Sequence, residues 1–174
     1  MEPITNRVAE SGIQVLDLAS LAPAGEMATV DLKPFLFQEL ILREKHFREQ
    51  VRDHDWAAYA GRHVAITCSV DTIVPLWAYM LITAQLEGVA ASVTVGSAHD
   101  VRREHFLAAL DRYDWSQHAD SIVVVKGCGT SEVPESAFVQ AMSRLQKVAR
   151  KVMFGEPCSS VPLWRRPKAA ASAG

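Results

Sequence analysis

Three cysteines carry the most reactive side chains in this sequence of 174 residues. Cys68 directly follows a predicted strand at 63–67, and Cys128 follows another predicted strand at 121–125. Cys158 lies beyond the last predicted helix. A thiolate is both a metal ligand and a nucleophile, and a position just before a helix N-terminus favours the thiolate form. The three positions therefore predict either a metal site or thiol chemistry.

The residues around the cysteines favour metal ligation. A Val-Pro pair soon follows each cysteine, and the first two pairs, at 74–75 and 133–134, begin predicted helices. Small neighbours can donate hydroxyl or backbone N–H groups to sulfur, as in the second shell of iron–sulfur and zinc sites. We expect Cys68, Cys128 and Cys158 to hold an iron–sulfur cluster or zinc. The expected neighbours are Ser69, Gly127, Gly129 and Ser159.

This metal site depends on the order of the strands. If the strands before Cys68 and Cys128 are neighbours, their ends lie about 5 Å apart, and about 10 Å apart if the strand at 92–95 separates them. No CxxC pair is present, so the zinc-ribbon spacing is absent. Cysteine is also among the most buried residue types, which leaves three inert core thiols as an alternative. The candidates for a fourth ligand are Asp71, Glu156, His54, water and a ligand from a partner protein.

Two other features could support chemistry. Asp53 and Asp55 flank His54 and can orient its ring, although a solvent-exposed histidine at a helix C-terminus is the simpler interpretation. The segment 127–131 (GCGTS) joins a predicted strand to a predicted helix, where backbone N–H groups can hold an anion. It lacks the Gly-Lys-Ser/Thr ending of a P-loop, so phosphate binding is the weaker expectation. His99 and His105 are expected at the surface.

Alternating strands and helices predict an α/β fold. We expect a three-layer sandwich with a mainly parallel sheet, a βαβαβα core and an N-terminal cap of strands and a helix, with an antiparallel edge possible. The first strand is expected at 13–18, and a helix is expected to open at Pro34. The other expected strands cover 28–32, 63–67, 92–95 and 121–125, and the other helices cover 74–87, 97–113 and 134–152.

Size and charge restrict the class of protein. The length favours one domain, residues 1–166, with a disordered tail at 167–174. The formal net charge is −2, and no long basic block is present, so no nucleic-acid partner is expected. No signal peptide is visible, and the apolar run at 73–86 is too short to cross a bilayer. We therefore expect a cytoplasmic protein with reduced thiols and no membrane partner. Edge strands near the N-terminus leave a homodimer open.

Several long strings resemble one bacterial family, known as domain of unknown function 2480. The resemblance covers residues 6 to about 164. It implies proteins encoded beside the sulfur-mobilisation machinery of iron–sulfur cluster assembly, and it implies no catalytic residues. The strings that carry it are Phe47-Arg48, His54-Asp55-Trp56, Thr67-Cys68-Ser69, Ile73–Leu81, Val125–Cys128 and Met153–Pro162.

Three functions follow from these observations. The first is a metal- or iron–sulfur-binding accessory protein of cluster assembly, with the assembly proteins as partners. The second is a thiol enzyme in which Cys128 is the nucleophile of persulfide or disulfide exchange. The third is a non-catalytic interaction module with structural cysteines.

Overall fold

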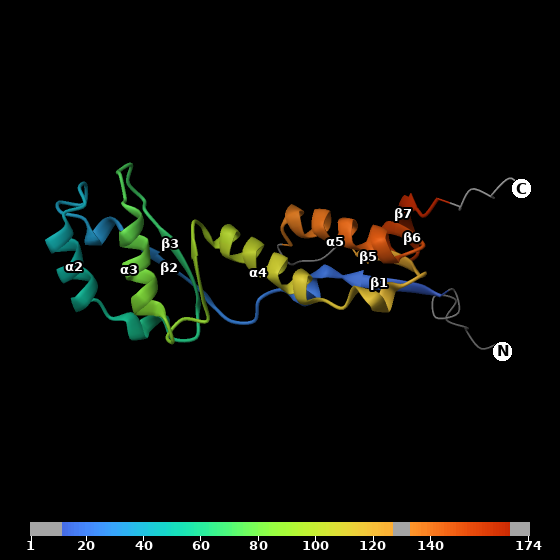
Figure 1. Cartoon of the computed structure of the whole chain (residues 1–174), viewed down its shortest axis with the longest axis horizontal. Coiled ribbons are helices and arrows are strands. Elements are labelled where there is room, and N and C mark those ends of the chain that lie inside the picture. The colour runs from blue at the N-terminus through green and yellow to red at the C-terminus, as the bar shows by residue number, and fades with distance from the viewer. Residues whose placement is uncertain (1–11, 127–132, 168–174) are drawn as a thin grey trace, which may run out of the picture. The chain divides into compact units, whose positions relative to one another are not determined.

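The computed structural model describes residues 12–126 and 133–167 (Figure 1). The chain divides into two compact units, each with its own sheet and hydrophobic core. Unit 2 is the continuous segment Pro23–His105, and unit 1 combines the residues up to Ala22 with those from Phe106 onward. The expected α/β class is confirmed, but the strands form two sheets rather than one. The single domain over 1–166 stays a prediction, and the expected tail is described only at Pro167.

Unit 2 contains a parallel sheet of three strands in the order β2-β3-β4. Its α2 and α3 pack on one face of the sheet, because Val30, Val64 and Ile66 point to the same core as the buried side chains of both helices. The first turns of α4 cover the other face, where Thr94 donates a hydrogen bond to Glu104. The elements are β2 (Met27–Asp31), α2 (Glu44–Asp53), β3 (His63–Thr67), α3 (Leu76–Leu86), β4 (Ser92–Val95) and the start of α4 (Ala98–Arg112).

Unit 1 contains a sheet of four strands in the order β1-β5-β6-β7, in which only β7 is antiparallel to its neighbour. The second half of α4 and all of α5 pack on the face formed by Leu16, Val123, Val125 and Val152. The middle of β5 is buried on both faces, as its unbroken apolar run predicts. The elements are β1 (Ile13–Asp17), β5 (Ile122–Lys126), α5 (Glu135–Val148), β6 (Lys151–Glu156) and β7 (Ser159–Arg165).

The two units repeat one pattern of elements. In both, an edge strand leads to a 3₁₀ turn, and an α-helix then leads through a second 3₁₀ turn to the central strand, a helix and a third parallel strand. The strand registers correspond, since Met27 pairs with His63 in unit 2 and Ile13 with Ile122 in unit 1. Along the chain, unit 2 is thus inserted into unit 1 between Ala22 and Phe106, and its last residues form the first half of α4. The 3₁₀ turns are η1 (Leu18–Leu21), η2 (Lys33–Phe35), η3 (Trp56–Tyr59) and η4 (Trp115–His118).

The repeat has local causes that recur at one constant offset along the chain. Trp56 and Trp115 each donate an indole N–H to a backbone oxygen at the end of the preceding helix, at 2.8 and 2.9 Å. Asp55 and Asp114 cap the two 3₁₀ turns with a carboxylate oxygen that accepts from the backbone N–H two residues on. Positive φ angles recur at Gly61 and Asp120, and at Gly96 and Gly155. The same hydrogen bonds and turns therefore direct both chain segments.

Two predicted helices differ from the structure. Only the short η2 forms at Pro34, and α2 begins later, at Glu44. The last helix ends at Val148, and Lys151–Glu156 forms a strand in place of the predicted helix end and loop. The other predicted strands and helices are confirmed within a few residues. Among the described residues, none of the helices has both the length and the hydrophobicity needed to cross a membrane.

Candidate functional site

Cys68 lies immediately after β3, as predicted, and its side chain is half-buried against the unit 2 core. Its Sγ lies 3.4 Å from the carbonyl oxygen of Val70, to which the thiol donates. The neighbouring Ser69 donates its hydroxyl to Asp31 rather than to sulfur. Cys68 is a free thiol whose described contacts are those of a packed side chain with one weak hydrogen bond.

Cys158 is exposed in the turn between β6 and β7, and Ser159 begins β7 beside it. The helical end predicted for residues 149–152 would have left Cys158 at the opposite end of the sheet. Because β6 instead runs parallel to β5, Cys158 follows the carboxyl end of its strand. That is the sheet edge at which β5 also ends, at Lys126, and sites in parallel sheets are built at this edge.

The remaining thiol, Cys128, lies outside the described residues, as do Gly127 and Gly129. Neither strand order considered for Cys68 and Cys128 occurs, because β3 and β5 are strands of separate sheets. Strand adjacency therefore gives no reason for these two thiols to meet. Within 12–126 and 133–167, the structure contains no cluster of three His, Cys, Asp or Glu side chains that fits a metal ion.

A cavity of about 370 Å³ lies beside the edge strand β2 in unit 2. We call it the unit 2 crevice. Asp31 and Phe35 line it from the end of β2 and from η2, and Gln50, Asp53, His54 and Tyr59 line it from α2, the residue after it, and η3. All of these residues belong to one unit.

The aromatic side of the crevice is built around His54. The imidazole lies 5.1 Å from the ring of Phe35 and 4.5 Å from that of Trp56, between ring centroids. His54 Nε2 lies 3.3 Å from the hydroxyl of Tyr59. Burial, and after it the charge of Asp55, raises the pKa of Tyr59, so this hydroxyl stays protonated near neutral pH. The rings thus form a semi-rigid wall with polar atoms at its edge.

The acidic side of the crevice is held by hydrogen bonds to Asp31. Burial by itself would raise the pKa of this carboxyl group, but hydrogen bonds from Ser69 and from the backbone N–H of Lys33 outweigh it. The pKa of Asp31 therefore lies below its ordinary value, and the group is ionised at neutral pH. The other carboxylate, Asp53, is exposed at the end of α2. Two carboxylates thus line the same crevice as the aromatic residues.

Unit 1 has the same ring pair with the residue types exchanged. Tyr113 and His118 occupy the positions of His54 and Tyr59, and their rings stack at 5.8 Å between centroids. Here the histidine is closed in: His118 is only 3% exposed, its Nδ1 donates to Gln14, and its Nε2 accepts from Tyr113 at 3.0 Å. Burial lowers the pKa of His118, so the ring is kept neutral. The pair Tyr113 and His118 therefore has a structural role in unit 1, whereas the pair His54 and Tyr59 borders a cavity in unit 2.

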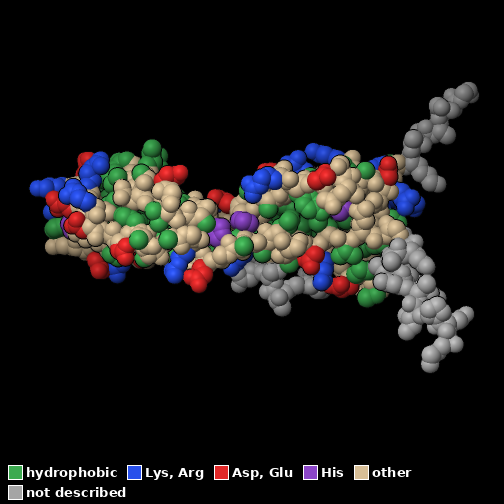
Figure 2. Space-filling view, turned by 90° about the horizontal axis from the view of Figure 1, so that it is seen from below, with side chains coloured by type: hydrophobic (Ala, Val, Ile, Leu, Met, Phe, Trp, Pro, Cys, Tyr) green, Lys and Arg blue, Asp and Glu red, His purple; other side chains and the backbone are tan. Residues whose placement is uncertain are grey.

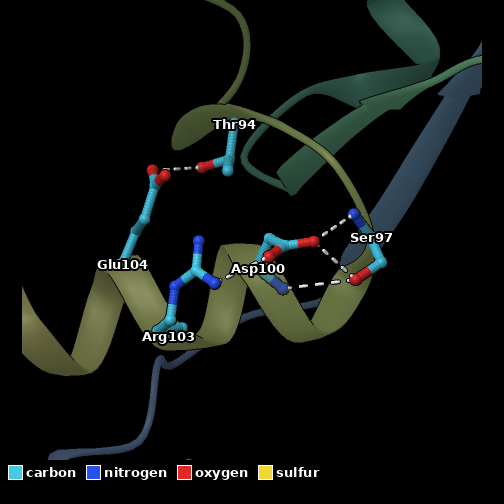
Figure 3. A network of polar contacts seen from close by, with 5 residues as sticks. All are labelled: Thr94, Ser97, Asp100, Arg103 and Glu104. Carbon is cyan, nitrogen blue, oxygen red and sulfur yellow. Dashed lines mark hydrogen bonds and ion pairs between the residues drawn. The ribbon is translucent and has the colours of Figure 1, made fainter. Parts of the chain in front are cut away.

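A polar network at the start of α4 joins that helix to the unit 2 sheet (Figure 3). Ser97 and Asp100 form a capping box, with the backbone N–H of Ser97 2.8 Å from the carboxylate. These hydrogen bonds lower the pKa of Asp100, and Arg103 pairs with it at 3.1 Å. Thr94 is buried and donates to Glu104 at 3.0 Å. Every labelled side chain has a partner within the network, which identifies it as a fold-stabilising feature.

Sequence reasoning selected His54 and its neighbour Asp53 but missed the other polar and aromatic residues that line the crevice. The missed residues are Asp31, Phe35, Gln50 and Tyr59, which the fold brings together from separate segments. One signal was available: the strings His-Asp-Trp-Ala-Ala-Tyr at 54–59 and Tyr-Asp-Trp-Ser-Gln-His at 113–118 differ by an exchange of His and Tyr at their ends. On the face drawn in Figure 2, side chains of both charges are interspersed in each unit.

Comparison with known proteins gives one match. No curated protein and no solved structure matches the chain. A family model described as "Protein of unknown function (DUF2480)" matches residues 2–166. The match covers nearly the whole chain, including both units, their aromatic ring pairs and all three cysteines. The resemblance found in the sequence is confirmed: the chain belongs to the family of domain of unknown function 2480.

Proposed function

We propose that the chain is a non-catalytic binding protein that takes a small ligand in the unit 2 crevice. The observation that carries the proposal is the contrast between the two repeats. In unit 1, His118 is buried and its ring is hydrogen-bonded to Gln14 and Tyr113, whereas the counterpart pair of unit 2, His54 and Tyr59, borders a cavity of about 370 Å³. This volume lies within the usual range for small-molecule sites, which combine an apolar wall with a few polar groups.

Two residues of the crevice, Tyr59 and Asp31, are suited to holding a ligand. The Tyr59 hydroxyl is held protonated by its raised pKa, and Asp31 is ionised and already accepts hydrogen bonds from Ser69 and Lys33. Neither side chain is poised to exchange protons near neutral pH. Both can position a ligand by hydrogen bonding and charge.

The test is a ligand panel measured with variants that fill the crevice. Gln50 is exposed and lines the crevice, so Gln50→Trp should occupy the cavity without disturbing the core. Lys45→Trp, on the same helix but outside the lining, is the matched control. A ligand present at about one hundred times its Kd should stabilise the wild-type protein by about 2.7 kcal/mol. Thermal unfolding should show this stabilisation in the wild type and in Lys45→Trp, and its loss in Gln50→Trp. Equal stabilisation of all three proteins would place the ligand elsewhere and refute the proposal.

A second candidate is the metal- or iron–sulfur-binding accessory protein expected from Cys68, Cys128 and Cys158. One observation favours it: β6 leads Cys158 to the carboxyl edge of the unit 1 sheet, beyond which Cys128 follows β5 along the chain. Against it stands the position of Cys68, which belongs to unit 2 and contacts that core. The partners would be iron–sulfur assembly proteins.

Anaerobic purification with elemental analysis and visible absorption tests this candidate. We expect bound iron or zinc that is lost in Cys128→Ser and in Cys158→Ser, with Cys68→Ser as the comparison. Metal-free protein with three titratable thiols would refute metal binding. If one of these thiols alkylates far faster than the others at neutral pH, the thiol-exchange chemistry expected of Cys128 is favoured instead.

A further inference from the structure

The charge of the unit 2 crevice points to the kind of ligand that it binds. Asp31 and Asp53 both line the cavity, and among the described lining residues there is no lysine or arginine. Lys33 lies near Asp31 but pairs its ammonium group with Glu39, at 3.1 Å. The crevice is therefore electronegative, and a bound cation would neutralise carboxylates that have no lysine or arginine partner in the lining.

The aromatic wall favours an organic cation. Phe35, His54 and Tyr59 all line the crevice, and ammonium groups are attracted to the faces of aromatic rings. Gln50 adds an amide oxygen that can accept from an N–H donor. The described part of the chain contains no three-ligand cluster of the kind that a bare metal ion needs. An ammonium ion, which uses hydrogen bonds and ring contacts, fits this lining better.

The unit 1 repeat carries its own cations at the corresponding positions. Lys126 lies 3.7 Å from Asp17, the counterpart of Asp31, and Arg112 takes the position of Asp53 at the end of its helix. In unit 2 the counterpart of Lys126 is Thr67, and that of Arg112 is a carboxylate. Unit 2 thus lacks both of these positive charges, and a carboxylate stands where unit 1 has Arg112. A cation supplied from solution would take their place.

We propose that the unit 2 crevice selects a small organic ammonium ion, a primary amine in preference to a neutral or anionic molecule. This inference rests on the proposed function, because it names the chemical class of the ligand for the same crevice. The ammonium group would lie between Asp53 and the rings, where Asp31 adds charge from the other side.

Three probes with the same four-carbon chain test the inference on the full-length protein. They are 1,4-diaminobutane, 1,4-butanediol and succinate, titrated while the NMR signals of the His54 and Tyr59 side chains are recorded. We expect saturable shifts with the diamine only. Asp53→Asn should weaken its binding by at least about tenfold, as expected for the loss of one close charge. Asp53→Arg, which installs the unit 1 residue type, should abolish it.

Glu87→Gln is the matched control, since it removes one exposed negative charge from unit 2 outside the crevice. It should leave diamine affinity within about twofold, because Glu87 does not line the crevice and the charge of an exposed side chain is screened by water and salt. Far-ultraviolet circular dichroism shows whether each variant is folded. If succinate or the diol shifts the signals of His54 and Tyr59 and the diamine does not, the ammonium class is refuted while ligand binding in the crevice stands. If the diamine causes no shift at these two residues, or shifts them equally in Asp53→Arg, the inference is also refuted, and the panel with Gln50→Trp decides the broader proposal separately.

Discussion

Replacing Phe106 with alanine is expected to lower the free energy of unfolding of unit 1 by about 3–5 kcal/mol. The ring is fully buried and packs in the unit 1 core with residues of β1, β5, α5 and β6. Its removal loses the transfer free energy of a large apolar group and leaves a cavity between α4 and α5. Because the core of unit 2 is made of other residues, the loss should fall mainly on unit 1.

Urea denaturation and native-state hydrogen exchange measure this effect. Amides of β5 should lose protection in Phe106→Ala, and amides of β3 should keep most of theirs. Val139→Ala is the control: this side chain lies on α5 in the same unit and is 71% exposed, so the change should stay within about 0.5 kcal/mol. A uniform loss of protection in both sheets would contradict the division into two separate cores.

Gly155→Val is expected to destabilise the β6–β7 pairing by about 3 kcal/mol or more. Gly155 has a φ of +119°, a conformation that residues with a side chain rarely adopt. A Cβ at this position would lie 2.8 Å from the backbone oxygen of Ser159, which belongs to the paired strand and cannot move independently. Both backbone strain and a steric clash therefore act on the turn that carries Cys158.

Gly88→Ala separates the two contributions. Gly88 also has a positive φ, +73°, but a Cβ there meets nothing within 4 Å. It should cost about 1–2 kcal/mol, the usual penalty of left-handed backbone for a residue with a side chain. Chemical denaturation gives both values, and exchange of the β7 amides reports on the hairpin. Equal costs for the two variants would mean that the contact with Ser159 has no effect.

Local structure followed the sequence where short-range chemistry decides it. The Val-Pro pairs at 74–75 and 133–134 stand directly before α3 and α5, because proline suits the start of a helix. The helix predicted over 97–113 forms as α4, and a capping box of Ser97 and Asp100 begins it. The two failures concern Pro34 and the segment after Val148. In the segment after Val148, the spacing of the apolar residues suits both a helix and a strand. Pairing with β5 and β7 selects the strand for 151–156.

The sheet order was not accessible from local patterns. The strand β1 pairs with β5, although all of unit 2 lies between these two strands in the sequence, and β2 pairs with β3. Strands of similar composition do not encode which neighbour they take, and the prediction therefore merged two sheets into one. The internal repeat would have indicated two sheets, since the corresponding segments 54–59 and 113–118 mark two units with the same order of elements.

Sequence patterns alone established the α/β class, the family, and most strands and helices, and they singled out the three thiols as candidate site residues. The tertiary structure decided that β3 and β5 belong to separate sheets, that Cys158 follows a parallel strand, and that Asp31, Asp53, His54 and Tyr59 border one cavity in unit 2. The physical reason is the distance along the chain between the residues that interact. Caps, turns and helix starts depend on residues a few positions apart, whereas strand pairing and cavities depend on contacts between distant segments, whose free energies are set by the packing of each unit as a whole.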